Sequence, residues 1–250
     1  MFIRHESLRS FLKLYPIVSI LIVIHLILFL IIHLFPGGEF VLYWGVGQNG
    51  LIAQGEYWRV ITPIFLHASF AHMLFNSFSL YLFGPALEQM LGKGKFIISY
   101  LVMGIIPNIF TFFMEDAFFT QLGASGAIYG LFGIYLYMVM FRKDLIDRGS
   151  AQIVTTILII GLVMTFVMPN INILAHLFGF ISGLAISPII LRRAKPYTMH
   201  IEVQHRVEHD KPTFKPNRWE QRNANRNTIQ KVIWGLFIIF VIAGILVYLR

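Results

Sequence analysis

The stretch LGASGAIYGLFG, which spans residues 122–133, places a serine among small residues at the start of an apolar segment. Gly126, Gly130 and Gly133 recur at helical spacing, so they form a smooth strip on the predicted helix. A strip of glycines lets the backbone of a second membrane helix approach closely. Ser125 is then either a packing residue or a nucleophile, and the rest of the chain has to decide between the two.

The composition indicates a membrane protein with several spans. The chain of 250 residues is 57% hydrophobic and only 13% charged, whereas about a quarter of a soluble domain is charged. It therefore has too few polar residues to cover a water-facing surface. There are no cysteines, which excludes disulfide bonds and thiolate metal sites.

Seven apolar runs are long enough for a helix to cross about 30 Å of hydrocarbon. The runs are continuous, whereas the strands of a membrane barrel alternate with a period of two. No A-x-A-like cleavage site follows the first run, so we expect a retained span there and not a signal peptide. The runs cover residues 16–35, 62–83, 96–114, 124–141, 151–168, 173–191 and 232–249.

The charges predict the orientation of these helices. Lysine and arginine gather on one side of the predicted spans, which the positive-inside rule assigns to the cytoplasm. The N-terminus is then cytoplasmic and, after seven spans of a multi-pass cell-membrane protein, the C-terminus lies outside. The net charge of +8 is explained by topology, so the bilayer is an expected partner and nucleic acid is not. The inner basic residues are Arg4, Arg9, Lys13, Lys93, Lys95, Arg142, Lys143 and Arg148, and the outer acidic residues are Glu39, Glu56, Glu115 and Asp116.

The fold class is therefore an all-α polytopic membrane protein, with a six-helix core and one C-terminal transmembrane helix. Two further segments are predicted to be non-helical: an outer loop rich in glycine and aromatics over residues 36–57, and a polar tether. The predicted parts are a cytoplasmic N-terminus (1–15), the core (16–194), a basic cytoplasmic linker (195–231) and the seventh helix (232–250).

Ser125 occupies a special place on its helix. It follows a polar loop, so it is expected in the first turn, near the outer face, where the N–H groups have no intrahelical partner and the dipole is positive. Its own N–H is free to bind an oxyanion, while Gly123 and Gly126 leave room for a substrate backbone. The stretch lacks the final glycine of G-x-S-x-G and no strand precedes it, which disfavours an α/β-hydrolase.

A serine nucleophile needs a base, and the sixth run supplies a histidine. In the stretch NILAHLFGFISG, His176 lies a few residues from the outer loop, so its depth matches that of Ser125. Gly179 and Gly183 follow at i+3 and i+7, on the face that carries the imidazole. Two helices lined by glycine pack closely enough for a Ser–His hydrogen bond, whereas an isolated histidine is more often satisfied by a neighbouring carbonyl.

The second run adds two side chains that can donate hydrogen bonds to an oxyanion. His72 and Asn76 are four residues apart and share a face. His67 lies off that face and is interpreted as an interface or packing residue. The histidines lack a metal-binding spacing such as H-E-x-x-H, so no metal and no cofactor are expected. A Gly-x-Gly-Asp stretch is absent, which disfavours an intramembrane aspartyl protease.

Together these residues resemble the rhomboid family of intramembrane serine proteases, over about residues 16–191. Each motif alone is weak, but their order and depth are specific. The motifs are GEYWRVITPIFLHASFAHMLFNSFSLYLFG, LEQMLGKGKF, GASGAIYG and AHLFGFISG.

The resemblance implies a catalytic dyad of Ser125 as nucleophile and His176 as general base, with no acidic third member. His72, Asn76 and the Ser125 N–H would form the oxyanion hole. Tyr129, one turn below the serine, would stack on the imidazole and fix the ring without a buried carboxylate; its alternative role is ordinary helix packing.

The resemblance also implies that Arg59 and Glu88 are structural, and that the seventh helix is an addition to the core. The predicted function is cleavage of transmembrane protein substrates near the outer leaflet. One alternative is a catalytically silent relative that binds transmembrane helices. A transporter is disfavoured, because the fifth and seventh runs carry only scattered serine and threonine. The substrate and the oligomeric state stay open.

Overall fold

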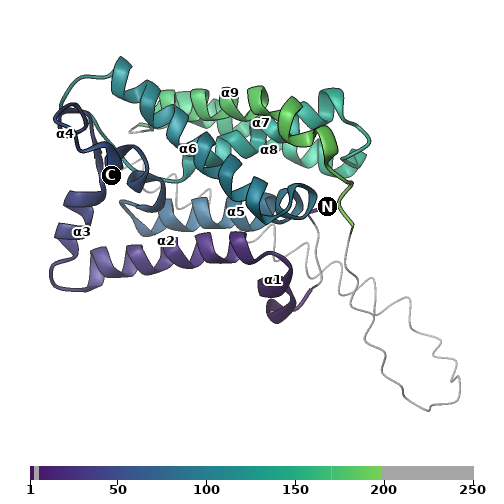
Figure 1. Cartoon of the computed structure of the whole chain (residues 1–250), viewed down its shortest axis with the longest axis horizontal. Coiled ribbons are helices and arrows are strands. Elements are labelled where there is room, and N and C mark those ends of the chain that lie inside the picture. Colours follow the sequence, from purple (N-terminus) through teal and green to yellow (C-terminus); the bar gives the residue numbers. More distant parts are fainter. Residues whose placement is uncertain (3–5, 170, 199–250) are drawn as a thin grey trace, which may run out of the picture. The chain divides into compact units, whose positions relative to one another are not determined.

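The computed structural model describes residues 1–2, 6–169 and 171–198, and most of them are helical (Figure 1). Four described helices are long and apolar enough to cross a membrane, and α7 (Ser125–Phe141) is a shorter apolar helix. These helices support the predicted multi-pass membrane protein. The seventh helix predicted at 232–250 lies outside the described residues, as does most of the 195–231 linker. The four long helices are α2 (Pro16–Leu34), α6 (Lys93–Met114), α8 (Arg148–Val167) and α9 (Ile173–Ile190).

Helix α7 is the most enclosed of the described helices, because every residue from 126 to 135 is buried. It packs against α6 and α9, and α8 lies beside it (Figure 1). A helix that is apolar and buried all round belongs in the centre of a bundle. The fold therefore places Ser125, the first residue of α7, at one end of the central helix.

The second predicted span is displaced in the structure. We expected residues 62–83, but the helix is α5 (Phe70–Leu91), and residues 62–65 form a 3₁₀ turn. The apolar Ile64 is 1% exposed and packs against Gly104 of α6, so the start of the predicted run is buried loop and not part of the helix. Ser69 starts the helix by accepting a hydrogen bond from the His72 N–H. The helix also continues through Pro85, which the predicted end at residue 83 did not anticipate.

Glu88 joins the far end of α5 to the start of α2. Its carboxylate accepts hydrogen bonds from the N–H groups of Ile17 and Val18, each at 2.9 Å. These donors belong to the first turn of α2, where no intrahelical acceptor exists. The structural role expected for Glu88 follows directly from this cap.

The sequence predicted a non-helical outer loop at residues 36–57, and this prediction was wrong. The segment contains the helices α3 (Gly38–Gly45) and α4 (Asn49–Ala53). The buried Arg59 organises it by donating to the carbonyl oxygens of Tyr43 and Val46, at 2.6 and 2.7 Å, and to the Glu56 carboxylate. A charged side chain that ties several backbone carbonyls together is structural, as the resemblance implies. The other short elements are α1 (Leu8–Leu14) and the 3₁₀ turns Tyr57–Val60, Thr62–Phe65 and Leu191–Arg193.

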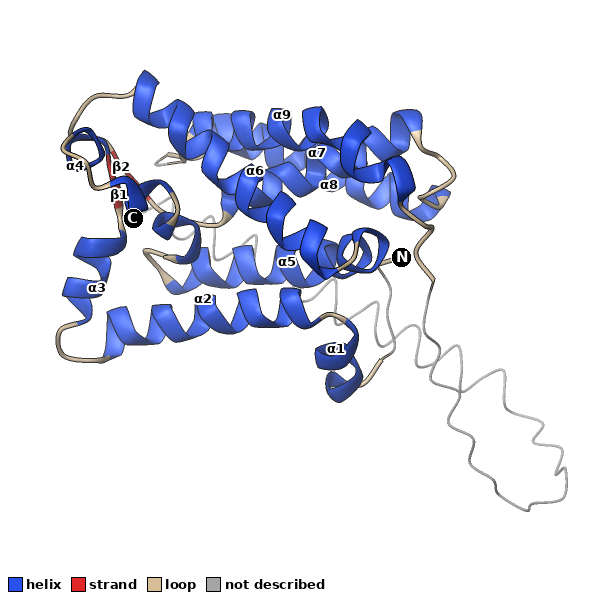
Figure 2. Ribbon diagram, viewed as in Figure 1, coloured by secondary structure: helices blue, strands red, loops and turns tan. Residues whose placement is uncertain are grey.

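A two-stranded antiparallel sheet connects this outer loop to the segment before Ser125 (Figure 2). Strand β1 (Gly47–Gln48) pairs with β2 (Thr120–Gln121). The loop that leads into α7 is therefore held at two points along the chain. The pairing helps to fix where the N-terminus of α7 lies.

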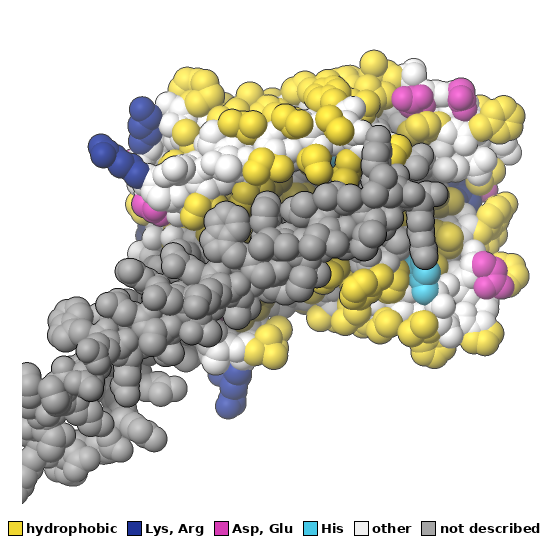
Figure 3. Space-filling model, turned by 180° about the vertical axis from the view of Figure 1, so that it is seen from behind, with side chains coloured by type: hydrophobic (Ala, Val, Ile, Leu, Met, Phe, Trp, Pro, Cys, Tyr) yellow, Lys and Arg dark blue, Asp and Glu magenta, His cyan; other side chains and the backbone are white. Residues whose placement is uncertain are grey.

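Charged side chains gather at the two ends of the described part, and apolar side chains cover the band between them (Figure 3). Lysine and arginine are seen at one end, and most of the visible acidic side chains are at the other. Exposed apolar residues of α2 and α8 include Ile20, Ile159 and Val163. An apolar surface of this kind is suited to lipid and unsuited to water.

Candidate active site

The backbone conformation of the loop before Ser125 requires glycine at position 123. Gly123 has φ +124°, a conformation that side chains rarely adopt. A Cβ there would also lie 2.7 Å from Cε1 and Nε2 of His72, so the imidazole covers this backbone closely. The Gly123 N–H donates to the carbonyl of Pro63 at 2.8 Å. His72 is thus held against the loop, two residues before Ser125.

Helices α7 and α9 approach each other backbone to backbone, as predicted. A Cβ on Gly179 would overlap the carbonyl oxygen of Gly126, and a Cβ on Gly183 would overlap that of Gly130. Glycine is therefore required on α9 at both contacts. Because His176 precedes Gly179 by less than one turn, this contact brings the histidine to the first turns of α7.

His176 lies flat against Tyr129, one turn below Ser125. The two ring centroids are 4.0 Å apart, with 17° between the planes. At the start of α9, the Asn172 side chain accepts from the Ala175 N–H at 2.9 Å and donates to Gln121 at 3.0 Å. The second bond ties the start of α9 to the strand that leads towards Ser125.

The hydrogen bond expected between Ser125 and His176 is not formed among the described residues. His176 uses Nδ1 for a bond of 2.8 Å to Oγ1 of Thr165, a residue of α8. His176 as a whole is 9% exposed. Nε2 is the ring nitrogen left for Ser125, and such bonds are often long in structures without substrate.

Thr165 is the residue of this site that the sequence analysis missed. It is 2% exposed and contacts the Tyr129 hydroxyl at 2.9 Å as well as His176. In the sequence it is one of several threonines scattered along an apolar run. Its position close to the C-terminal end of α8, at the same predicted depth as His176, is the signal that could have singled it out.

The two expected oxyanion donors, His72 and Asn76, lie one turn apart on α5, and the imidazole of His72 lies beside the Gly123 loop. Asn76 is 6% exposed, and its Nδ2 donates to the His72 carbonyl at 3.0 Å, one turn earlier. This bond uses one of the two amide protons and holds the side chain along the His72 side of the helix. The second proton remains for a ligand.

His67 is a buried packing residue, which is one of the two roles that the sequence suggested for it. Its ring meets His25 edge-on at 4.7 Å and His72 edge-on at 5.1 Å between centroids. Neither ring nitrogen has a hydrogen-bond partner among the described residues. The His67 imidazole therefore packs against the His72 ring. No group of three acidic or histidine side chains in the described part could hold a metal ion.

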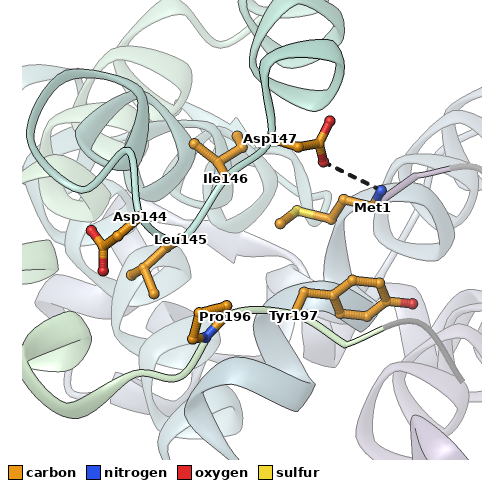
Figure 4. A pocket seen from close by; sticks show the side chains of 7 residues that line it. All are labelled: Met1, Asp144, Leu145, Ile146, Asp147, Pro196 and Tyr197. Atoms are coloured by element: carbon orange, nitrogen blue, oxygen red, sulfur yellow. Dashed lines mark ion pairs between the residues drawn. The ribbon is translucent and has the colours of Figure 1, made fainter.

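A cavity of about 330 Å³ lies beyond the opposite end of α7 and is separate from this site. The Met1 amino group forms an ion pair with Asp147 at 3.6 Å beside it (Figure 4). A hydrogen bond from the Arg142 guanidinium lowers the pKa of the Asp144 carboxyl at its rim. The cavity is lined by Met1, Asp144, Leu145, Ile146, Asp147, Pro196 and Tyr197.

Comparison with known proteins matches residues 54–193 to the model of the rhomboid domain. YdcA of Bacillus subtilis, whose name assigns it to the rhomboid proteases, is 45% identical over 195 residues, which cover 77% of this chain and 98% of YdcA. Rhomboid protease GluP of the same organism is 36% identical over 165 residues, covering 65% of this chain and 32% of GluP. Rhomboid-like protease 1 of Toxoplasma gondii is 32% identical over 190 residues, covering 73% of this chain and 64% of that protein.

The family match spans more than half of the chain. The chain belongs to the rhomboid family and is a rhomboid-type serine protease.

Proposed function

We propose that this protein is an intramembrane serine endopeptidase that cuts transmembrane segments of other membrane proteins, with Ser125 as nucleophile and His176 as general base. The observation that carries the proposal is the stack of His176 on Tyr129, one turn below Ser125, across helices joined by glycine contacts. This arrangement supports the proposal, because it brings the buried imidazole of His176 to the first turns of the helix that begins with Ser125.

The chemistry follows from these positions. The Ser125 hydroxyl attacks the scissile carbonyl while Nε2 of His176 takes its proton. The tetrahedral oxyanion is bound by the Ser125 N–H and by the side chains of His72 and Asn76. The imidazolium then gives the proton to the leaving amine, which leaves an acyl ester on Ser125. Water, deprotonated by the same imidazole, hydrolyses the ester and restores both residues.

The proposed cleavage site lies near the outer leaflet, with the N-terminus in the cytoplasm. Ser125 follows the acidic loop at Glu115 and Asp116, whereas Lys93 and Lys95 mark the other end of the bundle. In a substrate helix, the backbone carbonyl groups are hydrogen-bonded within the helix and are not accessible to a nucleophile. Residues that weaken the helix, such as glycine, should therefore favour cleavage.

The test is incubation of the purified protein with a transmembrane reporter that carries glycine and alanine near its outer end. We expect one cut, and mass spectrometry of the fragments locates it. A matched reporter with leucine at the same positions should be cut more slowly. A protein that binds the reporter and never cuts it is the catalytically silent relative, and the proposal is then wrong.

Asn76→Ala should lower kcat and leave KM nearly unchanged. An oxyanion donor acts mainly in the transition state and is worth about 100-fold or more in kcat. Michaelis kinetics on the reporter measure both constants. A variant with raised KM and unchanged kcat would assign Asn76 to ground-state substrate binding.

The linker and the predicted seventh helix should be dispensable for chemistry. A chain that ends after Thr198 keeps the described contacts, including the hydrogen bond of 2.9 Å between Tyr15 and Tyr197. We expect the truncated chain to cut the reporter with the kcat of the full chain. Its melting temperature can be lower without affecting this prediction. A folded but inactive truncation would show that residues beyond 198 shape the site or the substrate entrance.

A further inference from the structure

Thr165 connects three elements of the site through one oxygen atom. Its Oγ1 lies 2.8 Å from Nδ1 of His176, 2.9 Å from the Tyr129 hydroxyl and 2.8 Å from the carbonyl of Gly161 in its own helix. The Tyr129 hydroxyl also donates to the Gly161 carbonyl at 2.6 Å. All of these groups are buried or nearly so, and none is charged.

The number of protons in this cluster decides the tautomer of His176. The Gly161 carbonyl can only accept, and the Thr165 and Tyr129 hydroxyls bring one proton each. If Nδ1 carried no proton, two protons would have to serve four contacts, and lone pairs would face each other at 2.8–2.9 Å. With a proton on Nδ1, His176 donates to Thr165, and Thr165 and Tyr129 both donate to the Gly161 carbonyl, so that three of the four contacts hold a proton and only the Thr165–Tyr129 contact lacks one.

We propose that Thr165 is a positioning residue that holds His176 as the tautomer protonated on Nδ1, with the Nε2 lone pair directed to Ser125. The inference rests on the proposed function. In this proposal, the Thr165 hydroxyl orients the imidazole, as a carboxylate does in a catalytic triad. When Nε2 takes the proton of Ser125, the bond from Nδ1–H to Thr165 persists and the hydroxyl dipole faces the new positive charge.

A neutral partner suits this location. A carboxylate buried among membrane helices would have to lose its hydration, a penalty of several kcal/mol. The threonine hydroxyl is already polarised by its bond to the Gly161 carbonyl, which strengthens it as an acceptor. Glycine at position 161 also admits the tyrosine, since a Cβ there would lie 2.9 Å from the Tyr129 hydroxyl.

The test compares three variants of the full chain. Thr165→Val keeps the side-chain shape and removes the acceptor, whereas Thr165→Ser keeps the hydroxyl. Thr156→Val makes the same chemical change at an exposed position of α8. For each, we would measure kcat and KM on the reporter, the rate at which a fluorophosphonate labels Ser125, and the melting temperature.

We expect Thr165→Val to lower kcat and the labelling rate by about 10- to 100-fold, the size of effect seen when the hydrogen-bond partner that orients a metal-bound histidine is lost, with KM unchanged. Thr165→Ser should recover most of the loss, and Thr156→Val should match the wild type. A merely structural threonine would not produce this kcat-selective loss together with rescue by serine. If the valine variant does not fold, Thr165→Ala removes the hydroxyl without adding a methyl group beside the imidazole.

Two results would overturn the proposal. One is wild-type kcat in folded Thr165→Val or Thr165→Ala. The other is an equal loss in the serine variant, which would make side-chain shape, and not the hydroxyl, the cause. Failure of the proposed function looks different, because the wild-type protein itself would then neither cut the reporter nor take the label.

Discussion

Replacing Ser125 by alanine should abolish cleavage of the transmembrane reporter and leave the fold intact. The change removes one hydroxyl from the first residue of α7. Among the described residues, this hydroxyl forms no hydrogen bond that holds the helix in place. Loss of the nucleophile of a serine protease lowers kcat by about a millionfold. Fragment appearance on a gel, at equal amounts of folded protein, measures the effect.

Ser187→Ala is the matched control for this variant. Ser187 is a fully buried serine of α9 that donates to the Gly183 carbonyl, near the opposite end of the helix from His176. We expect it to retain cleavage. Continued cleavage by Ser125→Ala at the wild-type site would exclude Ser125 as the nucleophile.

Replacing Gly183 by alanine should destroy the contact between α7 and α9 and, with it, activity. The added methyl group overlaps the carbonyl of Gly130, a backbone atom that has no rotamer to move away. Overpacking of a core by side chains alone destabilises by about 1–3 kcal/mol, and a backbone clash belongs at or above the upper end. We expect a lower melting temperature and loss of reporter cleavage.

Gly94→Ala provides the comparison. Gly94 lies in the first turn of α6, and a Cβ there meets nothing within 4 Å. Alanine in a helix is more favourable than glycine by about 0.5–1 kcal/mol, so this variant should be as stable as the wild type or slightly more. If Gly183→Ala were equally stable and active, the close approach of α7 and α9 would be contradicted.

The spans were largely predictable from the sequence because lipid demands long apolar runs. The runs at 16–35, 96–114, 124–141, 151–168 and 173–191 lie close to α2, α6, α7, α8 and α9. The glycine contact of α7 with α9 was predictable as well, since glycine spacing maps directly onto one helix face.

The second span and the outer loop were mispredicted for physical reasons. Apolar residues such as Ile64 are buried in a short 3₁₀ turn, and hydropathy alone does not separate such packing from a span. The helices α3 and α4 are stabilised by tertiary bonds to Arg59 and to neighbouring segments, which short-range patterns do not contain.

The candidate site could be proposed from the sequence where its residues form motifs. Ser125, His176, His72 and Asn76 were proposed from their spacing and depth and from the family resemblance, and their roles stay predictions. Thr165 was not proposed, because its role depends on a contact between α8 and α9 that no spacing along one helix reveals.

The most direct test of the account is to map the residue that reacts with a fluorophosphonate. The purified full chain is treated with the probe, digested and analysed by mass spectrometry, with Ser187→Ala and His176→Ala in parallel. The account predicts a single phosphonate adduct on Ser125, retained in Ser187→Ala and strongly reduced without His176. A protein that cuts the reporter while Ser125 stays unmodified, or that carries the adduct on another serine, would contradict it.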